Sequence, residues 1–165
     1  MRRMIVSTAI SALVVLAAAG LALADGTNRA TKVLTPELAQ KILGGPVEAN
    51  PNNSQGDTEI GKTWVSRAYY SLKTSGGKSP QVGLLIRHGT DKAQSKSIFE
   101  SSKATFSGVD VAGLGAPAYR TKTPAQLNLL KGVNWLIISA GTFSVPDTAK
   151  QEQTAKEIIG KVAED

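Results

Sequence analysis

The sequence has no cysteine, a single histidine and only 5% aromatic residues. The absence of cysteine excludes disulfides, thiolate chemistry and a lipoprotein anchor. With one histidine, mainly carboxylates and carbonyls are left as metal ligands, and the sequence contains no D-x-D-x-D-G calcium loop. We therefore expect neither a metal nor a cofactor, and a fold that its apolar core holds together alone.

The sequence also lacks any concentration of positive charge. It carries 19 basic and 13 acidic residues, a net charge of +6, but the basic residues are scattered along the chain. A protein that binds nucleic acid gathers its positive charge on one face and places aromatic residues among it. Specific nucleic-acid binding is therefore not expected, while unspecific attraction to an anionic membrane or polymer surface stays open.

The N-terminus has the features of a secretory signal peptide. Two arginines precede an uncharged run over residues 4–24, which is rich in Ala, Leu and Val and ends in Ala22-Leu23-Ala24. Signal peptidase recognises this small-x-small ending, although about 20 apolar residues can also form an uncleaved anchor. We predict cleavage between Ala24 and Asp25, export to the periplasm or the medium, and no transmembrane segment after cleavage.

Three helices are predicted from capping and stop signals. Thr35 can cap a helix that Pro36 opens and that Gly44-Gly45-Pro46 stops. The two others are expected from Asp91 to Phe106 and from Asp147 to about Ala163, the latter with the stronger apolar stripe.

The strands are predicted from alternating or continuous apolar runs between turn signals. Thr63–Leu72 alternates and is followed, after a flexible turn, by an apolar run over 82–86, which indicates a hairpin. Another strand starts near Pro117. The runs 127–130 and 133–138 are separated by a Gly-containing pair and predict a second hairpin, whose last strand is apolar on both faces and therefore central.

Together these elements predict one α/β (α+β) domain over residues 34–165, preceded by a flexible segment over residues 25–33. The order α-β-β-α-β-β-β-α favours a two-layer sandwich, in which helices pack on a mainly antiparallel sheet of about five strands. The region 48–61, rich in Asn, Gly, Pro and Asp, is expected to be a surface loop.

Three stretches of the sequence carry a family resemblance: LTPELAQKILGGPV, VDVAGLGAPAY and LKGVNWLIISAG, the last of them before a final helix. In this order they resemble small exported bacterial domains with the PsbP-like α/β sandwich, which occur in lipoproteins and sensor ectodomains. The resemblance implies their fold but brings no set of catalytic residues. The chain departs from many of these domains because it lacks the lipobox cysteine and paired cysteines.

Two motifs are associated with catalysis in other proteins. Residues 113–118, GLGAPA, fit the dinucleotide fingerprint G-x-G-x-x-A, but a helical pattern precedes them and a strand follows, so we predict a structural turn. Arg87-His88-Gly89 resembles the opening of histidine phosphatases, in which a histidine attacks phosphorus. That chemistry needs a second histidine, and His88 is the only one in the chain, so we expect it to be a polar residue at the end of a strand.

The function that remains is a non-catalytic exported module that binds a protein, an envelope component or a small ligand. The alternative is an enzyme, with a hydrolase as the first choice, whose site is assembled from scattered residues. Neither the partner nor the oligomeric state follows from the sequence.

A binding surface is predicted from aromatic residues that lie beside arginines on strands. Aromatic side chains with polar tips are favoured at interfaces, because one group supplies both contact area and a hydrogen bond. We expect Arg67, Tyr69, Tyr119 and Arg120 to converge on one accessible surface.

Overall fold

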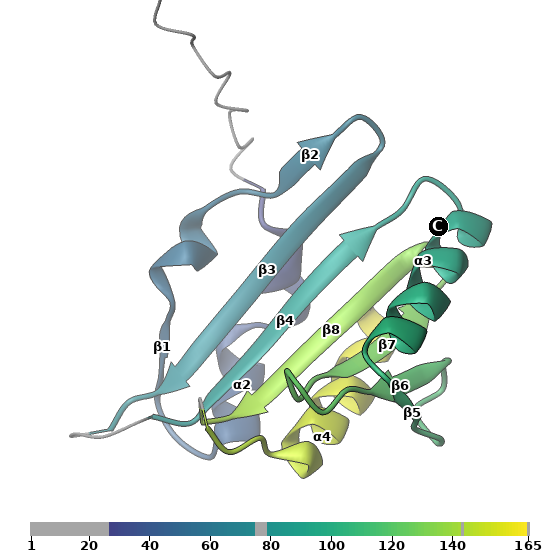
Figure 1. Ribbon diagram of the computed structural model, residues 1–165. Coiled ribbons are helices and arrows are strands. Elements are labelled where there is room, and N and C mark those ends of the chain that lie inside the picture. Colours follow the sequence, from purple (N-terminus) through teal and green to yellow (C-terminus); the bar gives the residue numbers. More distant parts are fainter. Residues whose placement is uncertain (1–26, 75–78, 143, 165) are drawn as a thin grey trace, which may run out of the picture.

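The computed structural model describes residues 27–74, 79–142 and 144–164. The predicted signal peptide and its cleavage site between Ala24 and Asp25 lie outside these residues. The described part forms an α+β fold with four α-helices and one open antiparallel sheet of eight strands (Figure 1). The expected fold class is confirmed at this level, but the sheet has more than the five strands predicted.

The strands pair in the order β1-β3-β4-β8-β7-β6-β5, and β2 also pairs with β3. The two predicted hairpins, β3–β4 and β7–β8, are confirmed, and β4 pairs with β8 to place the three longest strands side by side. The bounds of the strands are β1 Val47–Ala49, β2 Thr58–Ile60, β3 Thr63–Leu72, β4 Gln81–His88, β5 Val109–Asp110, β6 Ala118–Arg120, β7 Leu127–Lys131 and β8 Asn134–Gly141.

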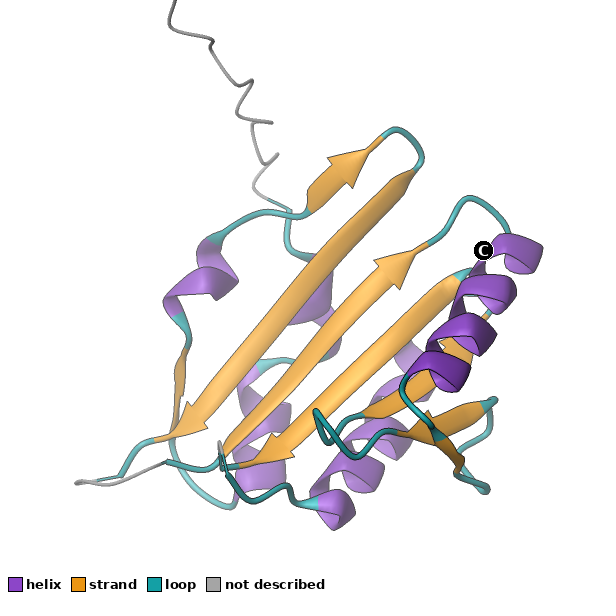
Figure 2. Cartoon of the chain, viewed as in Figure 1, coloured by secondary structure: helices purple, strands orange, loops and turns teal. Residues whose placement is uncertain are grey.

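The helices are distributed unequally over the two faces of the sheet. Three of them lie behind the sheet in Figure 1, and α3 alone lies in front of it, over β7 and the neighbouring edge of β8 (Figure 2). We call the first side the helix face and the second the open face. The helices are α1 Arg29–Val33, α2 Pro36–Leu43, α3 Lys92–Thr105 and α4 Thr148–Ile158, with short 3-10 turns η1 Pro51–Ser54 and η2 Ile159–Lys161.

The predicted capping residues are confirmed. The Thr35 side chain accepts a hydrogen bond from the backbone N–H of Leu38, and Gly44 ends α2 in the left-handed conformation at φ 80°. Asp91 and Asp147 cap α3 and α4 by accepting from the backbone N–H groups of Gln94 and Lys150. Side-chain oxygens at these positions satisfy N–H groups that have no partner within the helix.

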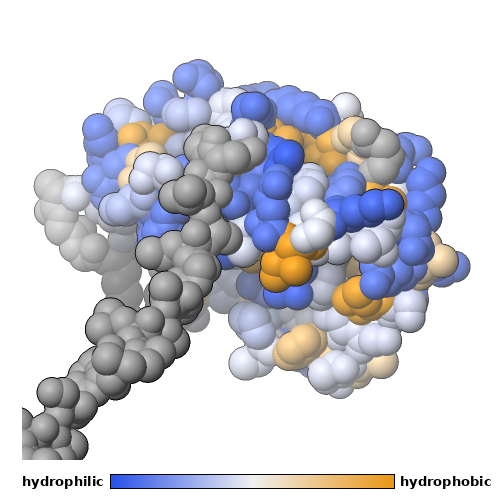
Figure 3. All heavy atoms as spheres, turned by 90° about the horizontal axis from the view of Figure 1, so that it is seen from above, coloured by the Kyte–Doolittle hydropathy of each residue, from blue (hydrophilic) through white to orange (hydrophobic). Residues whose placement is uncertain are grey.

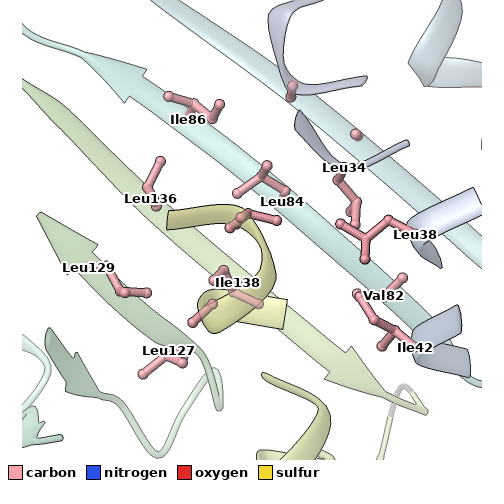
Figure 4. Close-up of a cluster of buried hydrophobic side chains, with 14 of the residues drawn as sticks. Leu34, Leu38, Ile42, Val82, Leu84, Ile86, Leu127, Leu129, Leu136 and Ile138 are labelled. Carbon is pink, nitrogen blue, oxygen red and sulfur yellow. The ribbon is translucent and has the colours of Figure 1, made fainter. Parts of the chain in front are cut away.

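The core lies between the helix face and its three helices (Figure 4). Successive side chains of a strand point to opposite faces, so alternate residues of β4, β7 and β8 enter the core. Burying a Leu or Ile side chain stabilises the fold by about 1.5–3 kcal/mol. The strand residues of this core include Val82, Leu84, Ile86, Leu127, Leu129, Leu136 and Ile138. Leu38 and Ile42 come from α2, and Leu34 comes from the link between α1 and α2.

Two segments expected to be irregular are ordered, so these predictions are wrong. Residues 29–33, expected to be flexible, form α1, whose Ala30 is completely buried. The region 48–61, expected to be a loop, contains β1, η1 and β2. These strands have only three residues each, too few to show an alternating pattern, and pairing with the long strand β3 is what extends them. At the other end, α4 stops at Ile158 and continues as η2 instead of reaching Ala163.

Two asparagine side chains occupy the edge of β3 between β1 and β2. Asn53 donates to the backbone oxygen of Tyr69 and accepts from its N–H, both at 2.8 Å. Asn28 donates to the backbone oxygen of Arg67 at 3.0 Å. Backbone groups on a free strand edge invite pairing with another chain. Asn28 and Asn53 therefore occupy backbone groups of β3 with which another strand could pair. A partner could still contact the side chains of β3 on the open face.

Candidate binding surface on the open face

The structure brings together only two of the four residues predicted to form a binding surface. Arg67 and Tyr69 are half-buried on the open face, side by side on β3. Tyr119 belongs to the same side of the sheet but is completely buried, and Arg120 belongs to the opposite side. The expectation that all four residues share one accessible surface is therefore wrong for Tyr119 and Arg120.

Tyr119 is inaccessible because side chains of α3 pack against it. Its ring packs against Phe99 of α3 with the centroids 4.7 Å apart, and its hydroxyl donates to the Ser102 hydroxyl at 2.9 Å. Burial raises the pKa of the Tyr119 phenol, and the hydrogen bond with Ser102 opposes that rise. Tyr119 is thus part of a small second core under α3, together with Leu130 and Trp135.

Arg120 links the sheet to α4 on the helix face. Its guanidinium Nη2 lies 2.7 Å from the Glu152 carboxylate of α4. Consecutive residues on a strand point to opposite faces. Because Tyr119 and Arg120 are consecutive strand residues, they cannot lie on the same face of the sheet. The sequence-based hypothesis did not take this into account.

The open face on β3, β4 and β8 is arranged in three rows across the strands. These rows are Val65–Arg87–Trp135, Arg67–Leu85–Ile137 and Tyr69–Gly83–Ser139. Sheet faces without a covering layer usually carry polar side chains. Here the middle of the face is apolar instead, with Leu85 and Ile137 half-buried beside each other.

In the row at Gly83, the ring of Tyr69 forms an aromatic surface, which we call the platform. A Cβ atom at Gly83 would collide with the ring of Tyr69 and would lie 2.7 Å from the Ser139 hydroxyl. The Tyr69 ring therefore lies across the backbone of β4, in the space that the missing side chain leaves. Glycine in the middle of a strand often marks such a close approach.

The two arginines of the open face have no carboxylate partner. Arg87 stacks on the ring of Trp135, with its guanidinium carbon 5.1 Å from the ring centroid. Within the described part of the chain, neither Arg67 nor Arg87 takes part in an ion pair. Both charges are thus available to an anionic group from outside.

A hollow of about 330 Å³ adjoins Arg87 on this face. Trp135, Ile137 and Asn128 lie along the sheet side of it. Phe106 at the end of α3 forms one wall, and Pro124 of the β6–β7 connection forms another. A second hollow of about 310 Å³ continues along β8 past Ser139 and shares Pro124 with the first. Among the residues that the structure describes, no Asp or Glu lines either hollow.

The end of the molecule at the top of Figure 1 is different. Seen from that end, hydrophilic side chains separate the apolar ones into small patches (Figure 3). Isolated apolar residues on a surface are normal and need no function. The open face differs from this end because its apolar residues adjoin one another across three strands.

His88 does not share a site with Arg87. Its ring stacks on Trp64 with the centroids 4.9 Å apart, and its Nδ1 lies 2.9 Å from the Asn134 side-chain oxygen. Arg29 of α1 covers the other side of Trp64 at 4.7 Å. Arg87 points instead to Trp135 on the open face. The arginine and histidine of the phosphatase-like triplet therefore bind different partners, and His88 ties β4 to its neighbouring strands.

The GLGAPA stretch is a turn, as predicted. It joins β5 to β6, and Gly113 and Gly115 have positive φ values of 80° and 75°. Such backbone angles favour glycine because it lacks a Cβ atom.

Sequence reasoning missed most of the open face: Leu85, Arg87, Trp135, Ile137 and Phe106. The available signal was the alternation along β4 and β8. Once Leu84 and Leu136 are placed in the core, their neighbours Leu85 and Ile137 must face the other side. What remained hidden was that no helix covers the centre of that side.

The described residues contain no group of three or more His, Asp or Glu side chains that could hold a metal ion. None of the helices within 27–74, 79–142 and 144–164 is long and apolar enough to cross a membrane. No protein-family model, curated protein or solved structure matches the chain.

Proposed function

We propose that the chain is an exported, non-catalytic binding module that holds its partner against the open face. The observation that carries this proposal is the pairing of half-buried apolar residues with unpaired arginines. Leu85 lies opposite Arg67 and two residues from Arg87 on β4, and Ile137 adjoins Leu85 on β8. Arg67, Leu85 and Ile137 are half-buried and Arg87 is exposed. Contiguous apolar surface rimmed by polar groups is typical of interaction sites.

The side chains on this face are of types that are common at protein interfaces. Arginine and tyrosine are enriched among the residues that dominate interface energies, since both combine apolar area with hydrogen-bond donors. Tyr69 and Arg67 supply this combination on β3, and Trp135 with Arg87 supplies it beside the hollow. The histidine that would be the first candidate for catalysis is engaged on Trp64 and Asn134.

Export is part of the proposal and is supported by the N-terminal sequence. The charged start, the apolar run and the small-residue ending favour cleavage after Ala24. The partner would then be an envelope component or another exported molecule, as in the PsbP-like domains that the sequence resembles. N-terminal sequencing of the exported form should begin at Asp25, and a membrane-bound product that retains Met1 would contradict this.

The test of the binding surface is photo-cross-linking in the producing cells. A photoreactive phenylalanine replaces Leu85 on the open face or, as a matched control, Lys156, which is exposed on α4. We expect a covalent adduct from position 85 and none from position 156, and mass spectrometry identifies the partner. Adducts of equal yield at both positions, or at neither, would show that the open face is not the binding surface.

A further inference from the structure

We propose that the partner on the open face is an acidic polypeptide segment that inserts an apolar side chain into the hollow beside Arg87. This inference rests on the proposed function and specifies the chemistry of its partner.

Two positive charges without ion-pair partners lie close together on the open face. Arg67 lies opposite Leu85, two residues from Arg87 on the same neighbouring strand, so the arginines are diagonal neighbours. Such neighbours are about 7–8 Å apart, within reach of one ligand for long side chains. The carboxylates on this face of the sheet lie away from both arginines. Glu48 is opposite Ser71 on the edge strand β1, and Asp110 of β5, opposite Tyr119, is paired with Lys103 of α3. Like charges at this spacing repel, and a carboxylate from a partner would relieve the repulsion.

The same charges disfavour a second copy of the chain as the partner. In a two-fold symmetric dimer each surface meets its own copy. A surface that carries Arg67 and Arg87 without ion-pair partners would then be brought against a second surface of the same positive charge. The face therefore complements an acidic molecule rather than itself.

Arg87 also lines the hollow of the open face. Phe106, 49% exposed, and Ile137 give it apolar surface, and no carboxylate lines it. The Trp135 Nε1–H already donates to the Asn128 side-chain oxygen at 3.0 Å, so a ligand in the hollow does not need to accept a hydrogen bond from it. A volume of about 330 Å³ accepts a large apolar side chain. The arrangement fits a segment in which an apolar residue lies next to an acidic one.

The shape of the open face suits an extended polypeptide. Beyond the hollow, the apolar surface continues over Ile137, Leu85 and Val65 across three strands, which is wider than a small ligand covers. A flat bilayer would be held away from this surface because α3 stands in front of the sheet beside it (Figure 1). An extended polypeptide can lie along the sheet beside α3 and reach both arginines.

The experiment selects peptides without prior choice of sequence. A phage-displayed library of random peptides about ten residues long, enough to cross the sheet when extended, is selected against the full chain. Parallel selections use Arg67→Gln/Arg87→Gln and the control Lys32→Gln/Lys156→Gln, which removes the same charge from exposed helical positions. Circular dichroism and thermal unfolding verify that each variant is folded.

We expect the wild type and the control to enrich peptides in which Asp or Glu adjoins Phe, Leu or Trp, and the open-face variant to enrich none of them. A synthetic copy of an enriched peptide should bind the open-face variant at least about tenfold more weakly, the loss typical for removal of a hydrogen bond to a charged group. Phe106→Ala should weaken the same peptide, and replacing its apolar residue by Ala should abolish that difference.

Several outcomes would overturn the inference. Enriched acidic peptides that bind Arg67→Gln/Arg87→Gln unchanged would place their site elsewhere. Enriched peptides without acidic residues that block cross-linking at Leu85 would contradict the acidic partner and leave the proposed function intact. Retention on phosphatidylglycerol vesicles without any peptide enrichment would identify a membrane surface instead. If no peptide is enriched but Leu85 cross-links in cells, only the peptide inference fails; if neither occurs, both proposals fail.

Discussion

On β4, Leu84 and Leu85 are adjacent in sequence and lie in two different environments. Leu84 is 0% exposed on the helix face, in contact with a core to which three helices contribute. Leu85 is half-buried on the open face, where neighbouring strands are its main cover. The basic side chains of the two sheet faces differ too. Arg29, Lys41 and Arg120 on the helix side have carboxylate partners, whereas Arg67 and Arg87 on the open face take part in no ion pair among the described residues. On the open side, Lys103 of α3 pairs with Asp110. One face of the sheet thus stabilises the fold by burial, and the other leaves side chains accessible to a partner.

The helix α3 lies between these extremes. It is on the open side, but only Ser95 and Phe99 of its residues are buried, whereas four residues of the shorter α2 are. Its aromatic contacts with Tyr119 and Trp135 cover one end of the open face. The small buried area explains why α3 narrows the open face without closing it.

The largest expected effect is a difference in the free energy of unfolding between variants of the two leucines of β4. Leu84→Ala should lower the free energy of unfolding by about 3–4 kcal/mol, because it leaves a cavity in the core. Leu85→Ala should lower it by about 1 kcal/mol, since that side chain is already partly in water. Urea unfolding of both variants measures the difference. Equal losses would show that the open face contributes to the fold as much as the helix face does.

The next effect tests the anchoring of α3. Phe99→Ala should cost about 3 kcal/mol, because Phe99 is the one large apolar side chain of α3 that is buried. Hydrogen exchange should show the amides of α3 opening more readily than those of α2. Its neighbour Ile98 is 47% exposed, and Ile98→Ala serves as the control with a loss within about 0.5–1 kcal/mol. Uniform loss of protection in α2 and α3 would contradict a locally anchored α3.

A smaller effect tests the platform on the open face. Gly83→Ala places a methyl group against the Tyr69 ring and should cost about 1–2 kcal/mol, because the ring must move. In a Tyr69→Ala background the same change should be nearly neutral, since the ring is gone. A double-mutant cycle from unfolding curves measures this coupling. Additive losses would mean that the ring of Tyr69 does not rest on Gly83.

The smallest effect concerns the acid sensitivity of the helix face. The side chain and backbone N–H of Lys150 bond the Asp147 carboxylate and hold its pKa below the usual range. A pKa that is lower in the folded state contributes stability above the unfolded pKa, about 3.9, and that stability is lost as the pH falls through the folded value.

Asp147→Asn keeps a capping oxygen but removes the titration. We expect it to change stability at neutral pH by less than about 1 kcal/mol, given the partial exposure of the pair, and to flatten the loss below about pH 4. Unfolding curves between neutral and acidic pH test this. An unchanged acid slope in Asp147→Asn would assign the sensitivity to other carboxylates, such as Glu157, whose pKa Lys41 lowers.

The candidate surface was only half predictable. Arg67 and Tyr69 were found because β3 alternates clearly over ten residues. Tyr119 was misplaced because its burial depends on α3, which is distant in sequence from the strand that it covers. Arg87 was considered only as part of a phosphatase-like triplet, although its contact with Trp135 joins two strands that the sequence separates widely.

The sequence by itself determined the elements whose signals are local. Capping residues, left-handed glycines and alternating apolar runs act within a few residues, so α2, the β3–β4 hairpin and the β7–β8 hairpin could be predicted from them. Only the tertiary structure decided the short strands β1, β2 and β5, since their hydrogen bonds come from partner strands and not from their own pattern. It also decided which side of the sheet stays uncovered. That choice depends on how three helices and their ion pairs pack against one face, a balance of long-range contacts that no local stretch of residues encodes.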